Sequence, residues 1–153
     1  MIKDISSNKV GFKNLEYTIT LLPLVPYLKL DGFASNGVNW DRPQPANVRL
    51  GADGKAVVNQ KPVLYTGTFS LLPTSNARNI LDQAINASTT KFGKELVDYV
   101  VVMTVANNTT GTKTVYSGGI IEEFDAGDTA DLENGQADKT YRVTFTDRVV
   151  LPL

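Results

Sequence analysis

The chain has 153 residues, which is a typical length for one domain. It contains neither cysteine nor histidine, and its formal net charge is −1. The missing residue types exclude disulfides, thiolate metal sites and histidine-based catalytic triads, and the balanced charge gives no electrostatic basis for direct nucleic-acid binding. We therefore expect a single domain over residues 1–153 with no cofactor, no metal and no enzymatic activity.

The first predicted strand is 17–21, where apolar and hydroxyl residues alternate. This period of two is typical of a half-buried strand. The surrounding apolar stretch, 19–30, is interrupted by Pro23 and Pro26 and includes Lys29. It is therefore unsuited to a membrane-spanning helix, and we expect no membrane contact and a short strand at 25–30. The polar, mixed N-terminal residues do not resemble a signal peptide, which favours a cytoplasmic setting.

Residues 31–62 form a long polar segment with few side chains that could fill a core. Within it, 46–50 and 55–58 flank a turn whose Asp53-Gly54 pair tolerates positive φ angles. The pattern predicts an extended hairpin arm at about 31–62. A connection of this length inside a compact domain usually has a function. Trp40 in this segment is either packed locally or a buried anchor in a subunit interface. The candidate interface residues of the arm are Trp40, Arg49, Leu50, Asp53, Gly54, Lys55 and Val57.

A strand predicted at 63–71 is followed by the one convincing helix. Ser75 or Thr74 can cap its N-terminus, since either hydroxyl accepts a hydrogen bond from the first helical turn. Apolar residues then recur at 77, 80, 81, 84 and 85, which is one stripe of a helix of about three turns. We expect that stripe to be buried, Arg78 and Asp82 to face away from it, and Asn86 to end the helix.

The remaining elements complete a β-rich chain. The nearly continuous apolar segment 98–105 predicts a central strand buried on both faces. Residues 113–121 predict its hairpin partner, with a bulge at Gly118-Gly119, and an acidic connection at 122–138 leads to a last strand at 140–150. With about six or seven strands and one helix, the sequence predicts a mainly β (α+β) fold, an antiparallel β-sandwich or barrel with one flanking helix.

The acidic connection admits three interpretations. Its carboxylates form a solvated loop, line a negative surface, or bind Ca²⁺, although their spacing does not fit the calcium-binding loop. Glu122 and Glu123 are also the best pair for acid–base catalysis on a glycoside. Adjacent residues of a regular strand point to opposite faces, however, so these two carboxylates are not expected to share a pocket.

Three parts of the sequence together resemble a known family. They are the run Leu30-Asp-Gly-Phe33, the arm turn Gly51–Lys55, and the run Gly67-Thr-Phe-Ser-Leu-Leu-Pro-Thr-Ser-Asn76 before the helix. This combination is similar to the tail tube proteins of contractile-tailed bacteriophages and related phage-like particles. The similarity extends over roughly residues 15–90, and the C-terminal third matches only in its kind of structure.

The resemblance implies a structural protein of the virion that assembles in the host cytoplasm. Such subunits form stacked rings, usually of six, in which strands of neighbours join into a continuous barrel and the arm reaches the next subunit or ring. Sheath, baseplate and terminator proteins are the implied partners, and DNA passes through a negative lumen without specific binding. The candidate lumen residues are Glu122, Glu123, Asp125, Thr66, Thr68 and Thr144.

The residues are compatible with that picture, because threonine-rich strand faces suit a wet interior and open sheet edges invite pairing between copies. Other functions stay open at this point. The chain is alternatively a tail terminator, a baseplate or hub component, or a carbohydrate-binding β-sandwich. A small hydrolase that uses Glu122 or Asp125 is a further alternative.

Overall fold

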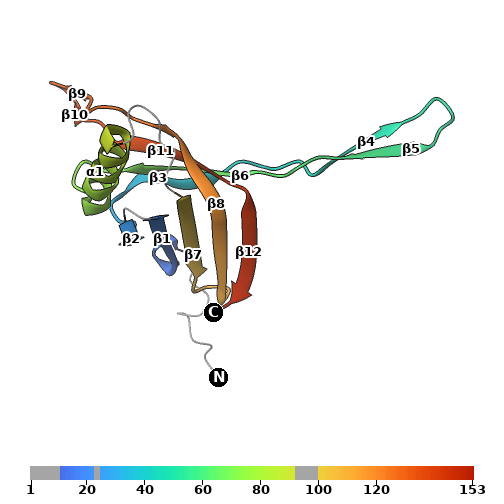
Figure 1. Cartoon of the computed structure of the whole chain (residues 1–153), viewed down its shortest axis with the longest axis horizontal. Coiled ribbons are helices and arrows are strands. Elements are labelled where there is room, and N and C mark those ends of the chain that lie inside the picture. The colour runs from blue at the N-terminus through green and yellow to red at the C-terminus, as the bar shows by residue number, and fades with distance from the viewer. Residues whose placement is uncertain (1–10, 23–24, 92–99) are drawn as a thin grey trace.

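The computed structural model describes residues 11–22, 25–91 and 100–153, which form a curled antiparallel sheet, one helix and two projecting hairpins (Figure 1). The N-terminal strands are β1 (Leu15–Leu22), β2 (Val25–Lys29) and β3 (Phe33–Trp40). The chain continues through β4 (Ala46–Leu50), β5 (Ala56–Gln60), β6 (Tyr65–Leu71) and the helix α1 (Asn76–Lys91). The C-terminal strands are β7 (Val100–Asn107), β8 (Thr112–Phe124), β9 (Ala130–Asp131), β10 (Gly135–Gln136), β11 (Lys139–Phe145) and β12 (Asp147–Pro152).

The main sheet has the strand order β2-β1-β7-β8-β11-β6-β3, and β12 pairs with the other half of β8. All of these pairings are antiparallel. The predicted mainly β fold with one helix is therefore confirmed. The β4–β5 and β9–β10 hairpins form separate two-stranded sheets, and Figure 1 shows them extending from opposite ends of the body.

The hydrophobic core lies between the curled sheet and α1. On β11, burial alternates strictly, so that the side chains of Tyr141, Val143 and Phe145 face the core and the intervening residues face outward. We refer to the side of β8, β11 and β6 that points away from the core as the outer face. The largest fully buried side chains are Tyr141, Phe69, Phe145, Ile19, Leu21, Leu71, Leu81, Met103, Val101 and Val143.

Helix α1 begins as predicted but differs in its length and in its charged side. Ser75 Oγ accepts a hydrogen bond from the backbone N–H of Arg78 at 3.3 Å, which is the expected N-terminal cap. The helix continues past Asn86 to Lys91, so the predicted end is wrong. Ile80, expected in the buried stripe, is 40% exposed, and Arg78, expected to face away, is buried.

The strands also depart from prediction at three places. Residues 33–40, expected in the arm, form β3 and pair with β6, so the projecting arm starts after Trp40. The last predicted strand is divided at Thr146 into β11 and β12, which pair with different halves of β8. β7 lies inside the sheet as predicted, but only one of its faces is buried. Residues 98–99 of that prediction lie outside the described residues.

The predicted bulge at Gly118-Gly119 is confirmed by a register shift between β7 and β8. Gly118 has a φ of +63°, and a Cβ there would collide with the side chain of Thr146. Glycine therefore allows β8 to bend at the point where its partner changes from β11 to β12.

Gly67 supports the single tryptophan, and replacing it should be costly. A Cβ at this position would lie 2.9 Å from the ring of Trp40, which itself stacks on Tyr116 at a centroid distance of 4.2 Å. We expect Gly67→Ala to lower the free energy of unfolding by about 1–3 kcal/mol through overpacking and to alter the fluorescence of Trp40. Urea unfolding monitored by that fluorescence is the measurement. Gly127→Ala, where a Cβ meets nothing within 4 Å, is the matched control, and equal effects of the two variants would refute the prediction.

Candidate interaction surfaces

The outer face carries a ladder of polar side chains. Thr66 on β6 and Thr144 on β11 are directly opposite in the register, and their hydroxyl oxygens lie 3.2 Å apart. Ser70 and Thr140 form a second such pair at 2.9 Å. These cross-strand bonds line the face opposite the core with hydroxyl groups, of which that of Ser70 belongs to a buried residue. The outer face is therefore polar, as the alternation of apolar and polar residues along β11 indicates.

A bulge brings both glutamates of β8 to this outer face. Arg142 is paired in register with Glu123, whereas Val143 is paired with Ile121, so Glu122 is the extra residue between them. Glu122 accepts a hydrogen bond from the hydroxyl of Thr144 and lies 3.5 Å from Arg142 Nε. The expectation that the two carboxylates point to opposite faces is wrong, because alternation does not continue through a bulge.

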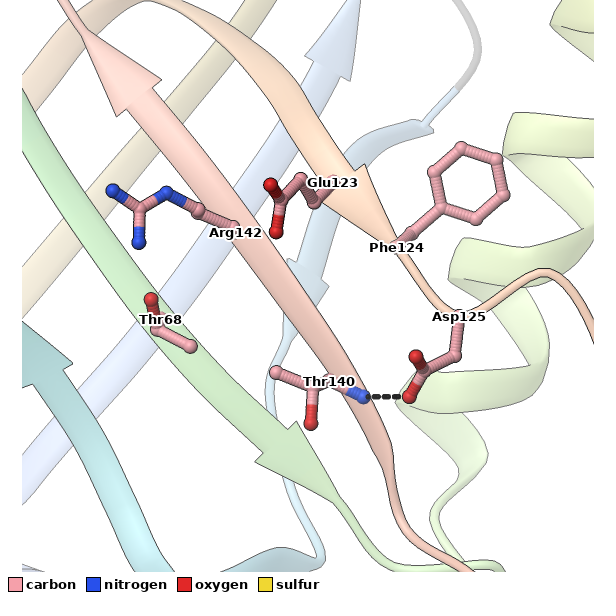
Figure 2. A pocket seen from close by; sticks show the side chains of 6 residues that line it. All are labelled: Thr68, Glu123, Phe124, Asp125, Thr140 and Arg142. Carbon is pink, nitrogen blue, oxygen red and sulfur yellow. Dashed lines mark hydrogen bonds between the residues drawn. The ribbon is translucent and has the colours of Figure 1, made fainter. Parts of the chain in front are cut away.

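The candidate lumen residues lie together on and beside this face. A cavity of about 350 Å³ is lined by Thr68, Glu123, Asp125 and Arg142, together with Phe124 and Thr140. Figure 2 shows these side chains around it, with Asp125 accepting a hydrogen bond from the backbone N–H of Thr140 at 2.9 Å. Across the strands, Arg142 also donates to Asp41 at 2.9 Å. The structure thus assembles Glu122, Glu123, Asp125, Thr66, Thr68 and Thr144 into one surface.

The arm is a regular hairpin whose strand residues are all exposed. Its turn is the predicted one: Gly54 has a φ of +80°, and the backbone N–H of Lys55 donates to Asp53 Oδ1 at 3.1 Å. Val48 is paired with Val58, and Arg49 is paired with Val57. Because opposite residues share a face, the arm has an apolar face formed by Ala46, Val48, Leu50, Ala56 and Val58, on which Gln60, opposite Ala46, is the polar strand residue.

The predicted interface residues of the arm are divided between its two faces. Leu50 belongs to the apolar face, whereas Arg49 and Val57 lie on the other face, which also carries Asn47 and Asn59. Val48 and Val58 are 63% and 57% exposed, and the sequence reasoning missed both of them. Their period of two along each strand was the signal that could have identified them.

Trp40 does not lie on the projecting arm but at its root. It stacks on Tyr116 and lies 6.3 Å from Phe145 between ring centroids. A cavity of about 280 Å³ opens beside it. Of the two roles predicted for Trp40, local packing is therefore present, and the cavity beside it leaves room for a contact. The residues that line this cavity are Trp40, Asp41, Pro43, Tyr65, Tyr116 and Arg148.

A buried charged cluster fixes the acidic connection to the helix. The Nζ of Lys139 donates to Asp82 and lies 3.1 Å from Asp128 Oδ1. Arg78 donates to Asp128 at 3.0 Å, and the hydroxyl of Tyr141 donates to Asp82 at 2.7 Å. Arg78 and Lys139 are only 4% and 8% exposed, and Arg78 Nη1 makes no hydrogen bond. Ion pairing offsets the cost of burying Arg78 and Lys139, while the side chain of Asp82 is 29% exposed. Arg78 therefore belongs to the interior although it is charged.

Because of this charged cluster, the free energy of unfolding should decrease at alkaline pH. Hydrogen bonding to Asp82 raises the pKa of Lys139 above its ordinary 10.5, and burial followed by Asp82 raises the pKa of Tyr141 above its ordinary 10.0. Both groups hold their protons more tightly when folded, so their contribution is complete below about pH 10 and is lost as pH rises further. Urea midpoints measured upward from about pH 8 should fall less steeply in Tyr141→Phe than in the wild type.

Part of that alkaline loss should remain in the variant, because burial also raises the pKa of Tyr17 and Tyr116. Identical slopes for Tyr141→Phe and the wild type would contradict the assignment. At low pH the direction reverses. Hydrogen bonds from Lys139 and from Asn134 lower the pKa of Asp128 and Asp131, respectively, so their contribution is present above about pH 4 and is lost as pH falls.

The two projecting parts of the chain carry opposite charge. Residues 41–61, which include the arm, contain four basic residues and two acidic residues: Arg42, Arg49, Lys55, Lys61, Asp41 and Asp53. The connection 122–138 contains no lysine or arginine and has seven carboxylates: Glu122, Glu123, Asp125, Asp128, Asp131, Glu133 and Asp138.

The described part of the chain has neither a metal-binding cluster of acidic, histidine or cysteine side chains nor a membrane-spanning helix. Among residues 11–22, 25–91 and 100–153, no three side chains of the types His, Cys, Asp and Glu are grouped so that they could hold a metal ion. Within the same ranges, no helix has the length and apolar character needed to cross a membrane.

Comparison with known proteins connects this fold to one family. A family model described as tail fiber protein gp32 matches residues 8–149. No match is found among curated proteins.

Several solved structures share the fold. A chain of the anti-feeding prophage cap, described as the tube-terminating cap, gives a TM-score of 0.53 at 11% identity over 100% of this chain and 95% of that chain. A chain of the anti-feeding prophage baseplate gives 0.51 at 11% identity, over 99% and 98%. A chain of the PVC sheath–tube complex, an extracellular contractile injection system in the extended state, gives 0.52 at 7% identity, over 100% and 99%. At identities this low, the similarity establishes a common fold alone.

Proposed function

This chain belongs to the tail fiber protein gp32 family, and we propose that it is a structural subunit of a phage tail or phage-like particle that self-assembles into stacked rings forming the inner tube. The arm is the observation that carries the proposal. Every residue of β4 and β5 is exposed, including Val48, Leu50 and Val58 on the apolar face. An apolar face presented on a projecting hairpin is typical of a surface that is covered in an assembly.

The outer face suits the lumen of such a tube. It presents threonine hydroxyls and the carboxylates of Glu122 and Glu123, with Arg142 bound to Asp41 and close to Glu122. A surface with this negative charge repels the phosphates of DNA, and the DNA would pass through the lumen without specific binding. We propose no catalytic role for Glu122 or Asp125.

The proposed partners follow from the same architecture. Copies of the chain would join in six-membered rings, by analogy with tail tubes, while sheath and baseplate or terminator proteins would contact the outside and the ends of the tube. The similar fold of a chain in a sheath–tube complex supports this set of partners. The protein would be assembled in the host cytoplasm and located in the virion.

A second function is favoured by the other two similar structures. Chains of a tube-terminating cap and of a baseplate have comparable TM-scores, so this chain is alternatively a component that ends a tube or joins it to the baseplate. The difference between the two functions is physical. A tube subunit has two complementary surfaces that repeat without limit, whereas a terminator forms one ring and stops.

Negative-stain electron microscopy of the concentrated, purified chain tests the proposal. Tubes of variable length with a central lumen are the expected result, and class averages of end views give the number of subunits. Single rings that do not extend would replace the tube function by the terminator function. Solid fibres without a lumen, or a strict monomer at every protein and salt concentration, would overturn the proposal.

A further inference from the structure

The β9–β10 hairpin presents an isolated hydrophobic side chain at its tip. Leu132, in the turn, is 108% exposed relative to the reference state, and turns usually contain glycine, asparagine, aspartate or proline. Asp131 accepts hydrogen bonds from the backbone and the side-chain amide of Asn134, which fixes the turn. At the root of the hairpin, Asp128 is bound by the buried Arg78 and Lys139. The hydrogen bonds of the turn and the ion pairs at the root of the hairpin therefore hold Leu132 in a defined position away from the body.

The cavity beside Trp40 has the opposite shape and lies at the other end of the body. Trp40 and Tyr116 are stacked at an interplanar angle of 16°, and Tyr65 meets Tyr116 edge-on at 6.2 Å. Together with Pro43 and Arg148, these rings line an open cavity of about 280 Å³. An aromatic cavity of this kind suits one branched aliphatic side chain, as in the central anchors of protein interfaces.

The charges around the two features are complementary. Asp131 and Glu133 flank Leu132 in the sequence. At the cavity, the guanidinium of Arg148 lies 5.9 Å from the centroid of the Tyr65 ring. Asp41, the acidic residue of the cavity lining, is already bound to Arg142 at 2.9 Å. Arg148 is therefore the charge that the cavity offers to the carboxylates on either side of Leu132.

We propose that Leu132 of one copy inserts into the aromatic cavity of the next copy, with Arg148 facing Asp131 and Glu133. The hairpin and the root of the arm lie at opposite ends of the body (Figure 1), so the contact joins copies head to tail. A contact of this type closes into a ring or continues as a filament. It rests on the proposed function, since it requires the chain to associate with copies of itself.

Cysteine cross-linking provides a direct test, because the chain has no cysteine of its own. A Glu133→Cys chain, which retains Leu132, is mixed with a Pro43→Cys chain that carries a larger tag, and the mixture is oxidised under assembly conditions. A cross-linked band of mixed size is expected. Gly127→Cys, at an open position near the root of the same hairpin, should give no such band with Pro43→Cys. A band from Leu50→Cys instead of Glu133→Cys would place the arm tip in the cavity and overturn the proposal.

Variants of the hairpin tip and of the cavity test the same contact through the protein concentration that assembly requires. Leu132→Asp should need about tenfold more protein to assemble, while Leu132→Met retains assembly. Arg148→Glu should weaken assembly, and adding Glu133→Arg should restore it. Tubes that form at the wild-type concentration with Leu132→Asp, or that form without the 43–133 cross-link, would overturn this contact and leave the proposed function intact. A wild-type chain that never associates would overturn both.

Discussion

Replacing Asp82 by alanine should lower the free energy of unfolding by about 3 kcal/mol, at the lower end of the cost of breaking a buried ion pair from one side, because the Asp82 side chain is 29% exposed. The substitution leaves the Nζ of Lys139, whose side chain is 10% exposed, with only the exposed Asp128 as a partner. It also removes the acceptor of the Tyr141 hydroxyl, which is fully buried. For a chain of this size the loss corresponds to a decrease of about 10 °C in Tm.

Urea and thermal unfolding of Asp82→Ala are the measurements, with Glu133→Gln as the control. Glu133 is also acidic but lies exposed in the β9–β10 turn, so its substitution should change the free energy of unfolding by less than about 0.5 kcal/mol. A loss below about 1 kcal/mol for Asp82→Ala would show that the cluster is solvated rather than buried.

Removing the arm should abolish assembly without destabilising the subunit. The backbone N–H of Lys61 donates to the carbonyl of Pro45 at 2.8 Å, so a two-residue Asn-Gly turn can join these positions in place of residues 46–60. Because all the removed strand residues are exposed, the free energy of unfolding should change by less than about 0.5 kcal/mol. Electron microscopy of the shortened chain should show no tubes.

The two faces of the arm provide a matched pair of variants for this prediction. Val48→Asp with Val58→Asp places two charges on the apolar face, and Asn47→Asp with Asn59→Asp places the same two charges on the opposite face. The first variant should prevent assembly and the second should retain it, since only the apolar face gains by being covered. Tubes of normal appearance from the shortened chain would mean that the arm is not a joining surface.

The sequence predicted the local features of this fold better than its long-range ones. The cap at Ser75, the positive φ of Gly54 and the alternation along β11 depend on neighbouring residues, which the sequence displays directly. The buried position of Arg78 and the ion pair of Asp82 depend on partners far along the chain, since Asp128 is 50 residues from Arg78 and Lys139 is 57 residues from Asp82. A charged residue on a helix is ordinarily exposed, so only the partner explains its burial.

For the candidate surfaces too, local features were predictable from the sequence and long-range pairings were not. The arm was predictable from its Asp-Gly turn and its lack of core residues, but the inclusion of β3 in the sheet was not. Asn36 and Gly37 interrupt any alternation in β3, and its pairing with β6 is long-range. The shared face of Glu122 and Glu123 depends on the register between β8 and β11, which no periodicity reveals.

The bulge at Glu122 has a consequence for any closed assembly of this chain. In a ring of identical subunits, each side chain recurs once per subunit at the same height along the axis. A single inserted residue in β8 therefore adds a complete circle of carboxylates next to the circle formed by Glu123. In the proposed tube, substitution of Glu122 would change the charge of an entire circumference of the lumen, so that a one-residue difference between related chains would set its electrostatic character.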